Sequence, residues 1–193
     1  MARVGILALQ GAFIEHVRAF ERVGAEAVEV RLPEQLRGLD GLVIPGGEST
    51  TMSLLMDIYG LREPVLELAR AGVPIWGTCA GMILLAKDVH DTRVRPLELM
   101  DLKVLRNAFG RQVDSFEADL RVPALGEKPF PAVFIRAPIV EGAGDGVEVL
   151  ARLPDGRIVA ARQGQFLATA FHPELTSDTR FHQFLLDMAD RKN

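Results

Sequence analysis

One cysteine stands in a sequence pattern that could carry nucleophilic chemistry. Cys79 is the only cysteine of the chain and lies in the segment Gly77-Thr78-Cys79-Ala80-Gly81, between two apolar stretches. A nucleophile with glycine at both second neighbours is typical of the nucleophile elbow, a tight strand-to-helix turn. The start of a helix favours a thiolate, because its partial positive charge stabilises the anion. The pattern predicts a thiol nucleophile with the backbone N–H of Ala80 as an oxyanion donor; a small buried hydrophobe is the alternative.

A thiol nucleophile needs a base, and the base needs an acceptor that orients it. His172 directly follows an apolar stretch, precedes a proline, and has Glu174 two residues further on. Strand ends in α/β folds face one crevice, so a histidine at such an end can meet Cys79 from a neighbouring strand. An ordinary turn is the alternative for His-Pro-Glu by itself. Together with the elbow pattern, the His-Pro-Glu segment predicts a catalytic triad of Cys79, His172 and Glu174.

The other three histidines have less informative surroundings. His16 and His182 fall within amphipathic helical patterns, where a solvated or structurally satisfied histidine is expected. His90 lies in a polar stretch that predicts a surface loop. None of the three is predicted to act as the base.

A glycine-rich turn ends another apolar stretch, in the segment Pro45-Gly46-Gly47-Glu48-Ser49-Thr50. Consecutive glycines allow backbone N–H groups to turn inward. The lysine and spacing of a phosphate-binding P-loop are absent, and a plain turn before a helix remains an alternative. Opposite a thiol, we expect Gly47 to supply a second oxyanion donor and the turn to contact the substrate.

Length and composition are those of one globular domain spanning residues 1–193. The formal net charge is only −4, with no polybasic run, so general affinity for nucleic acid or membranes is not predicted. No apolar stretch reaches the roughly 20 residues that span a bilayer, and no signal peptide is recognised. A single cysteine allows no intrachain disulfide and no CxxC metal site, so we expect a cytoplasmic protein without a metal.

Short apolar stretches alternate with helical patterns in the first half of the chain. Strands are predicted at residues 4–9, 27–30, 41–44 and 74–77. Helices are predicted at 12–23, from Ser49 or Thr50, either of which could cap the helix, at 63–71 and from 82. This alternation predicts an α/β fold with a mostly parallel sheet covered on both faces. Residues 99–149 predict short strands that extend the sheet in antiparallel or mixed fashion. A last strand at 166–171 and a closing helix at 178–189 follow.

These motifs together resemble the class I, triad-type glutamine amidotransferases. The match narrows to the family of glutaminase subunits of pyridoxal 5'-phosphate synthase, on the segments Leu7–Ala12, Glu15-His16, Pro45–Thr51 and Trp76–Met82. The resemblance runs from the first strand to the closing helix. It implies a three-layer, flavodoxin-like fold with a mixed, mostly parallel sheet and helices on both faces.

The resemblance also implies a substrate and its binding residues. The substrate is L-glutamine, hydrolysed to L-glutamate and ammonia without a cofactor. The residues implied to hold it are Gly47, Glu48, Ser49, Arg106, Ile135 and Arg136. The charges of these residues suit a free amino acid, whose ammonium can bind a carboxylate and whose carboxylate can bind guanidinium groups. Arg106 and Arg136 could instead be ordinary surface arginines.

A separate partner is implied in the same way. Ammonia would pass to a synthase subunit that builds pyridoxal 5'-phosphate, vitamin B6, in a hetero-oligomer, and docking would rearrange Gln10 and the Gly46-Gly47 region. Three alternatives stay open at this point: a glutaminase that feeds another biosynthetic enzyme, a catalytically silent binding module, and, more remotely, a thiol protease.

Overall fold

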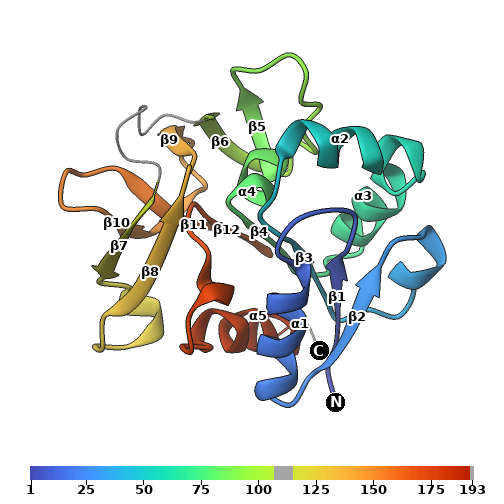
Figure 1. The fold of residues 1–193 in the computed structure, drawn as a ribbon, viewed down its shortest axis with the longest axis horizontal. Coiled ribbons are helices and arrows are strands. Elements are labelled where there is room, and N and C mark those ends of the chain that lie inside the picture. The colour runs from blue at the N-terminus through green and yellow to red at the C-terminus, as the bar shows by residue number, and fades with distance from the viewer. Residues whose placement is uncertain (107–114, 192–193) are drawn as a thin grey trace.

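The computed structural model describes residues 1–106 and 115–191, and its sheet is built from short strands (Figure 1). The strands are, in chain order, β1 (Arg3–Leu7), β2 (Glu26–Val30), β3 (Gly41–Ile44), β4 (Ile75–Thr78), β5 (Ala86–Val89), β6 (Met100–Leu105), β7 (Ser115–Leu120), β8 (Phe130–Ile135), β9 (Ile139–Ala143), β10 (Glu148–Arg152), β11 (Ile158–Gln163) and β12 (Phe166–Thr169).

The large sheet has ten strands in the order β2-β1-β3-β4-β12-β11-β9-β6-β5, with β10 pairing to β11. The five strands from β2 to β12 are parallel to their neighbours. In this half β3 and β4 are buried throughout, as expected for strands covered on both faces. Beyond β12 the pairs β12–β11, β11–β9 and β9–β6 are antiparallel. At the edge, β5 and β6 pair in parallel. The predicted mostly parallel sheet with an antiparallel or mixed extension is confirmed.

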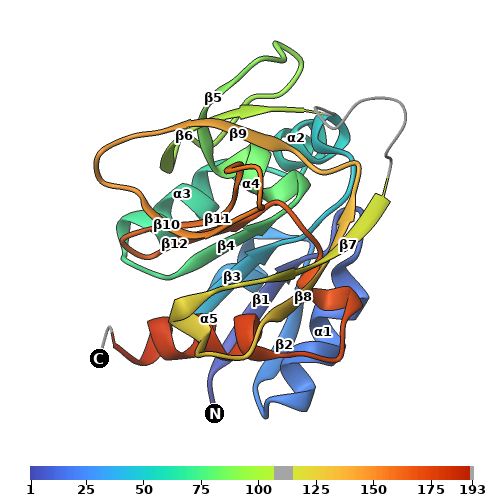
Figure 2. The same ribbon diagram turned by 90° about the vertical axis from the view of Figure 1, so that its left-hand side faces the viewer.

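Helices cover both faces of this sheet, as Figure 2 shows. Helices α1 and α5 lie on one side, and α2, α3 and α4 lie on the other. Their bounds are α1 (Phe13–Arg22), α2 (Ser49–Ile58), α3 (Arg62–Arg70), α4 (Ala80–Leu85) and α5 (Arg180–Asp190), with short 3-10 turns η1 (Pro33–Leu36), η2 (Pro123–Leu125) and η3 (Pro173–Leu175). These bounds agree with the predicted helices to within about two residues.

The cap of α2 differs from the prediction. Ser49 or Thr50 was expected to cap this helix, but Glu48 precedes its first residue. The Glu48 carboxylate accepts hydrogen bonds from the backbone N–H groups of Thr50, at 3.1 Å, and Thr51, at 2.7 Å. A carboxylate at this position satisfies two otherwise unpaired donors and also interacts favourably with the helix dipole, which a hydroxyl would do less strongly.

A two-stranded antiparallel ribbon, β7 and β8, crosses the end of the sheet near β12. Its inner face is apolar and includes phenylalanines: the Phe134 ring stacks on Phe116, and the Phe134 and Phe171 ring centroids are 5.4 Å apart. The backbone N–H of His172 donates to the Val133 carbonyl oxygen at 2.8 Å. This bond fixes the chain just after β12 to the ribbon, which therefore helps to place His172.

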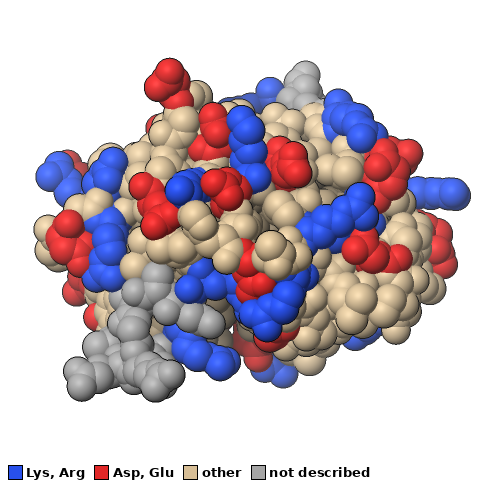
Figure 3. All heavy atoms as spheres, turned by 90° about the horizontal axis from the view of Figure 1, so that it is seen from above, with Lys and Arg blue, Asp and Glu red and all other residues tan. Residues whose placement is uncertain are grey.

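Charged side chains of both signs are interspersed on the face seen in Figure 3, without a large field of one sign. Within residues 1–106 and 115–191, no helix combines the length and the apolar character that crossing a membrane requires.

The buried parallel strands should dominate stability. Leu167 on β12 is completely buried. We expect Leu167→Ala to lower the free energy of unfolding by about 2–5 kcal/mol, because it removes apolar burial and leaves a cavity. Leu54→Ala, at an exposed position on α2, is the control and should change it by less than about 0.5 kcal/mol. Denaturant unfolding followed by circular dichroism measures both, and equal effects would contradict the assignment of the core.

Candidate active site

Cys79 sits in a tight turn between β4 and α4, as the elbow pattern predicts. Its φ angle is 49° and its ψ angle is −102°, a backbone conformation that non-glycine residues rarely adopt. A Cβ on Gly81 would lie closer than 3.0 Å to the Ile44 backbone, and one on Gly77 would lie as close to Gly81 itself. The two glycines are therefore required by close backbone approach. The Cys79 N–H donates to the Thr169 carbonyl oxygen at 2.8 Å, which ties the turn to β12.

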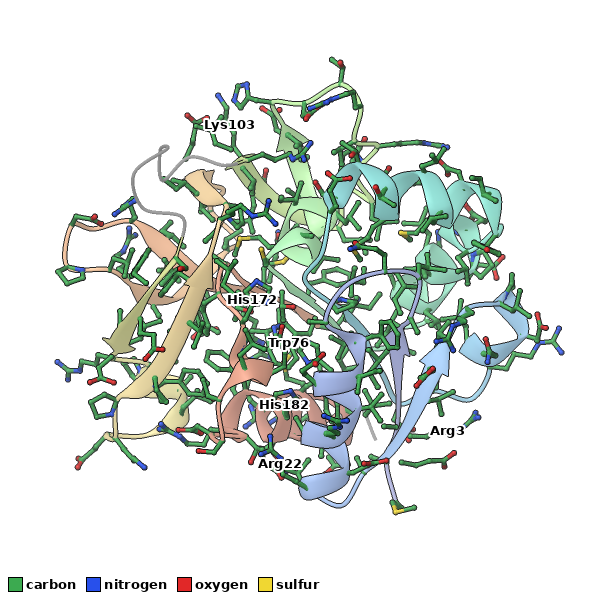
Figure 4. All side chains as sticks on the ribbon, in the orientation of Figure 1. Arg3, Arg22, Trp76, Lys103, His172 and His182 are labelled. Atoms are coloured by element: carbon green, nitrogen blue, oxygen red, sulfur yellow. The ribbon has the colours of Figure 1, made fainter. Side chains whose placement is uncertain are left out.

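Three neighbouring strand ends bring the predicted site together. Strand β4, which ends at the cysteine, pairs with β3 on one side and with β12 on the other. The Gly46-Gly47 turn follows β3, and His172 follows β12 near the centre of the molecule (Figure 4). A Cβ on Gly46 would lie closer than 3.0 Å to the His172 ring. Only a glycine lets this turn pack directly against the imidazole.

His172 and Glu174 form a buried pair. The distance from His172 Nδ1 to Glu174 Oε1 is 2.7 Å, and His172 and Glu174 are only 7% and 5% exposed. Burial by itself lowers the pKa of His172, but hydrogen bonding with Cys79 and Glu174 and the negative charges of both outweigh it and raise this pKa to about 10. The imidazole is therefore charged at neutral pH when the sulfur is a thiolate, as a nucleophile–base pair requires.

A pocket of about 360 Å³ opens over the sulfur. All of the predicted site residues except Glu174 line it, and Glu174 lies behind His172. The lining comprises Gln10, Gly11, Ala12, Gly46, Gly47, Glu48, Ser49, Cys79, Ala80, Ile83, Arg106, Ile135, Arg136 and His172. The pocket contains a potential nucleophile, a base and two guanidinium groups, which suits a small zwitterionic substrate.

The carboxylate of Glu48 already has several partners. Besides the backbone of α2, it accepts from the hydroxyl groups of Thr50 and Thr51 and pairs with Arg106 Nη2 at 2.8 Å. Burial acts to raise the pKa of Glu48, but these hydrogen bonds from the two threonines prevail and lower it to about 2. Arg106 also forms an ion pair with Asp91. Glu48 and Asp91 together hold the Arg106 guanidinium at the pocket.

Ser49 has a free hydroxyl at the pocket. It is 2% exposed, and its Oγ makes no hydrogen bond with any described residue. A buried hydroxyl without a partner is costly unless a ligand or water satisfies it. On the opposite wall, the Cys79 sulfur lies 3.9 Å from the Ile135 carbonyl oxygen, and Arg136 has a φ of 43°. Cys79 and Arg136, the two non-glycine residues with positive φ in the lining of this pocket, are thus at positions predicted to be functional.

Gln10 contacts the glycine-rich turn directly. Its Oε1 accepts a hydrogen bond from the Glu48 N–H at 2.7 Å, and the neighbouring Ala12 N–H donates to the Gly46 carbonyl oxygen at 3.0 Å. The segment after β1 therefore determines the conformation of the Gly46-Gly47 turn. A change in this segment would be transmitted to the turn.

Sequence reasoning missed three residues around the site. Asp91 was not singled out, and its pairing with Arg106 joins segments that no local pattern connects. His16 and His182, expected to be solvated or structurally satisfied, are both buried, and His16 Nδ1 lies 3.1 Å from His182 Nε2; what the prediction lacked was their place behind the site. Their positions on the apolar faces of two helices were the available signal. His90 is exposed and pairs with Glu141, in keeping with the predicted surface location. Among the described residues, no group of three or more His, Cys, Asp or Glu side chains could hold a metal ion.

Solved structures with this architecture exist. A structure described as a glutamine amidotransferase is 50% identical and has a TM-score of 0.92, over 97% of this chain and 98% of that one. The structure of PurLQS from Thermotoga maritima, 20% identical, has a TM-score of 0.70 over 96% and 98%, a likeness of fold alone. The fold is that of a class I glutamine amidotransferase, as predicted.

Sequence comparison gives the family. The SNO glutamine amidotransferase family matches residues 6–191. A protein named pyridoxal 5'-phosphate synthase subunit PdxT, from Dehalococcoides mccartyi, is 60% identical over 189 residues, 97% of each chain. A protein of the same name from Herpetosiphon aurantiacus is 60% identical over 188 residues, 96% of this chain and 99% of its own. The chain belongs to the SNO glutamine amidotransferase family, and the predicted resemblance is confirmed.

The charge state of His172 provides a test of the pair with Glu174. Its folded pKa of about 10 lies above the ordinary 6.5, so the imidazolium should persist to about pH 10. The stability that it contributes should be complete below about pH 6.5 and be lost as the pH rises through about 10. Glu174→Gln removes a negative charge, and we expect it to lower the pKa of His172. Nitrogen-15 NMR titration of the imidazole measures this, and an unchanged midpoint would contradict the pairing.

Proposed function

We propose that this chain hydrolyses L-glutamine to L-glutamate and ammonia, with Cys79 as the nucleophile. The observation that carries the proposal is the convergence of the elbow cysteine and the His172–Glu174 pair at one pocket. Membership of a glutamine amidotransferase family supports the substrate. The fold also suits one domain over the whole chain.

The Cys79 thiolate attacks the δ-carbon of the glutamine amide and forms a carbon–sulfur bond. The imidazolium of His172 then protonates the leaving nitrogen, the carbon–nitrogen bond breaks, and ammonia departs from a glutamyl thioester. Neutral His172 next removes a proton from water, whose oxygen attacks the thioester carbon. The carbon–sulfur bond breaks, which releases glutamate and restores the thiolate.

The negative oxygen formed in each attack needs hydrogen-bond donors. Ala80 begins α4, so its backbone N–H has no partner within the helix. Gly47 lies across the pocket, in the turn that packs against His172. We assign the two backbone N–H groups to the oxyanion, because donors fixed before the reaction stabilise charge that develops in the transition state.

Substrate recognition follows from the charged groups of the pocket wall. Arg106 and Arg136 are the guanidinium groups available for the α-carboxylate of glutamine. The free hydroxyl of Ser49 and the backbone of Gly47 and Ile135 offer further hydrogen bonds. Because the Glu48 carboxylate caps α2 and pairs with Arg106, its main contribution is to hold Arg106 and attract the substrate ammonium.

Ammonia released into water protonates and diffuses away, so a second active site must receive it directly. Relatives about 60% identical over nearly the whole chain are named subunits of pyridoxal 5'-phosphate synthase. We propose that this chain docks on the synthase chain of that enzyme in the cytoplasm, as a hetero-oligomer. Docking would act through Gln10 and Gly46, since the Gln10 side chain holds the backbone beside the proposed oxyanion donor.

Replacing the nucleophile is the first test. Cys79→Ala should lower glutamine hydrolysis by about four orders of magnitude or more, because no other group can form the thioester. Glutamate release by the complex with the synthase chain measures it. The control is Ser53→Ala on α2, a buried residue that does not line the pocket. Full activity in Cys79→Ala would overturn the mechanism.

The role of the partner is tested by comparing the free chain with the complex. We expect the synthase chain of the same organism to raise glutaminase turnover several-fold or more. Gln10→Ala should change this ratio, because it removes the acceptor for the Glu48 N–H that holds the turn. Equal turnover with and without the synthase chain would refute the coupling and leave the hydrolytic mechanism intact.

A further inference from the structure

Glu174 has one oxygen whose partner the proposed triad does not explain. Its Oε1 lies at His172 Nδ1, but its Oε2 makes no hydrogen bond of ordinary geometry with any described residue. The side chain is completely buried. An unsatisfied oxygen on a buried carboxylate is costly, and it leaves the carboxylate free to rotate away from His172.

The nearest donor-capable atom is on another buried histidine. His16 Nε2, from α1, lies 3.3 Å from Glu174 Oε2, and both side chains are completely buried. The same nitrogen lies 3.4 Å from the neutral Thr78 Oγ1. A shared proton on this nitrogen favours the carboxylate, because hydrogen bonds to a charged acceptor are the stronger ones.

A second histidine determines which nitrogen of His16 carries the proton. His182 Nε2, from α5, lies 3.1 Å from His16 Nδ1. Burial, together with the charges of His182 and His172, lowers the pKa of His16 well below 6.5. Burial and the charge of Arg22 lower the pKa of His182 to about 3. Both rings are therefore neutral near pH 7, and each has one donor and one acceptor nitrogen.

Only one arrangement of the two protons avoids an electrostatic conflict. If His16 carried its proton on Nδ1, its bare Nε2 would face the Glu174 oxygen, and two acceptors would repel each other. The proton of His182 would then sit on Nδ1, a buried atom without a partner. If instead both rings carry the proton on Nε2, His182 donates to His16 and His16 donates to Glu174. Trp76 packs edge-on against both rings, which restrains their orientation (Figure 4).

We propose that His16 is a positioning residue for glutamine hydrolysis: its Nε2 proton, directed by His182, holds the second oxygen of Glu174. The carboxylate is then fixed at both oxygens and aligned with His172. This role rests on the proposed triad. It adds two residues behind Glu174, His16 on α1 and His182 on α5, to the groups that hold the triad in place.

Other charged groups near Glu174 do not face Oε2 in the same way. His172 faces Oε1, and Cys79 lies beyond His172. The remaining groups line a surface hollow shared with Glu174 and belong to α1: Glu15, Arg18, Glu21 and Arg22. They are unchanged in every variant below, so their effects cancel in a comparison.

Matched variants at position 16 test the proposal. His16→Phe keeps a planar ring but has no donor, whereas His16→Gln places an amide N–H near the position of Nε2. In the complex with the synthase chain, we expect His16→Phe to lower kcat for glutamine hydrolysis about tenfold or more. Its KM should stay within about twofold, since His16 does not line the substrate pocket. His16→Gln should recover most of kcat.

The titration of His172 distinguishes positioning from packing. Without the donor at position 16, the Glu174 carboxylate is less firmly aligned with His172, so the pKa of His172, about 10 in the wild type, should fall in His16→Phe but not in His16→Gln. His182→Phe leaves His16 in place and removes only the directing proton. It should show a smaller loss of kcat in the same direction, and it provides an independent test if His16→Phe does not fold.

The results with these variants distinguish failure of the positioning role of His16 from failure of the proposed triad. Wild-type kcat in His16→Phe or in His182→Phe, an equal loss in His16→Phe and His16→Gln, or an unchanged pKa of His172 in His16→Phe would overturn the role of His16. Glu174→Gln serves as the reference. If Glu174→Gln lowers kcat and His16→Phe does not, only the positioning role fails. If Glu174→Gln keeps wild-type kcat, the triad itself is wrong.

Discussion

The charge on the buried imidazole of His172, stabilised by Cys79 and Glu174, is the interaction around which the site is built. Burial opposes the charge on His172, and hydrogen bonding and opposite charge from Cys79 and Glu174 overcome that opposition. These partners act only at short range, so the strand ends must meet closely. Glycine at position 46 permits that approach on one side, and the glycines around the elbow permit it on the other. The charge on His172 therefore depends on the close backbone packing that these glycines permit.

Helices on both faces of the sheet also contribute groups that lie around the site. On one side, α2 begins at the glycine-rich turn, and its cap, Glu48, pairs with Arg106 at the pocket. On the other, α1 and α5 supply His16 and His182 behind Glu174. Groups on both faces of the sheet thus surround the reacting atoms. The ribbon of β7 and β8 closes the remaining side, through the bond from His172 to Val133 and the stacked rings beneath it.

Short sequence patterns predicted the elements whose conformation depends mainly on residues adjacent in the chain. The elbow around Cys79, the His-Pro-Glu turn and the strands between them each have a short-range signature, and the shared edge of a parallel sheet explains why they meet. Glu48 replaced the expected hydroxyl cap because a carboxylate can bind both the helix start and Arg106. The roles of His16 and His182 were not predicted, because apolar helix faces indicate burial but not which faces pack together, and the role of Asp91 depends on a tertiary ion pair with Arg106. The link to pyridoxal 5'-phosphate synthesis was predicted from the resemblance to a known family, not from the chemistry of individual residues.

The most direct test of the central claim is to locate covalent modification by a glutamine analogue that carries an electrophile at the δ-carbon. Peptide mass spectrometry of the inactivated complex would identify the labelled side chain. We predict one label per chain, on Cys79, that glutamine prevents in proportion to its occupancy of the pocket and that His172→Gln slows. Complete inactivation with Cys79 unmodified, or labelling that glutamine does not prevent, would contradict the account.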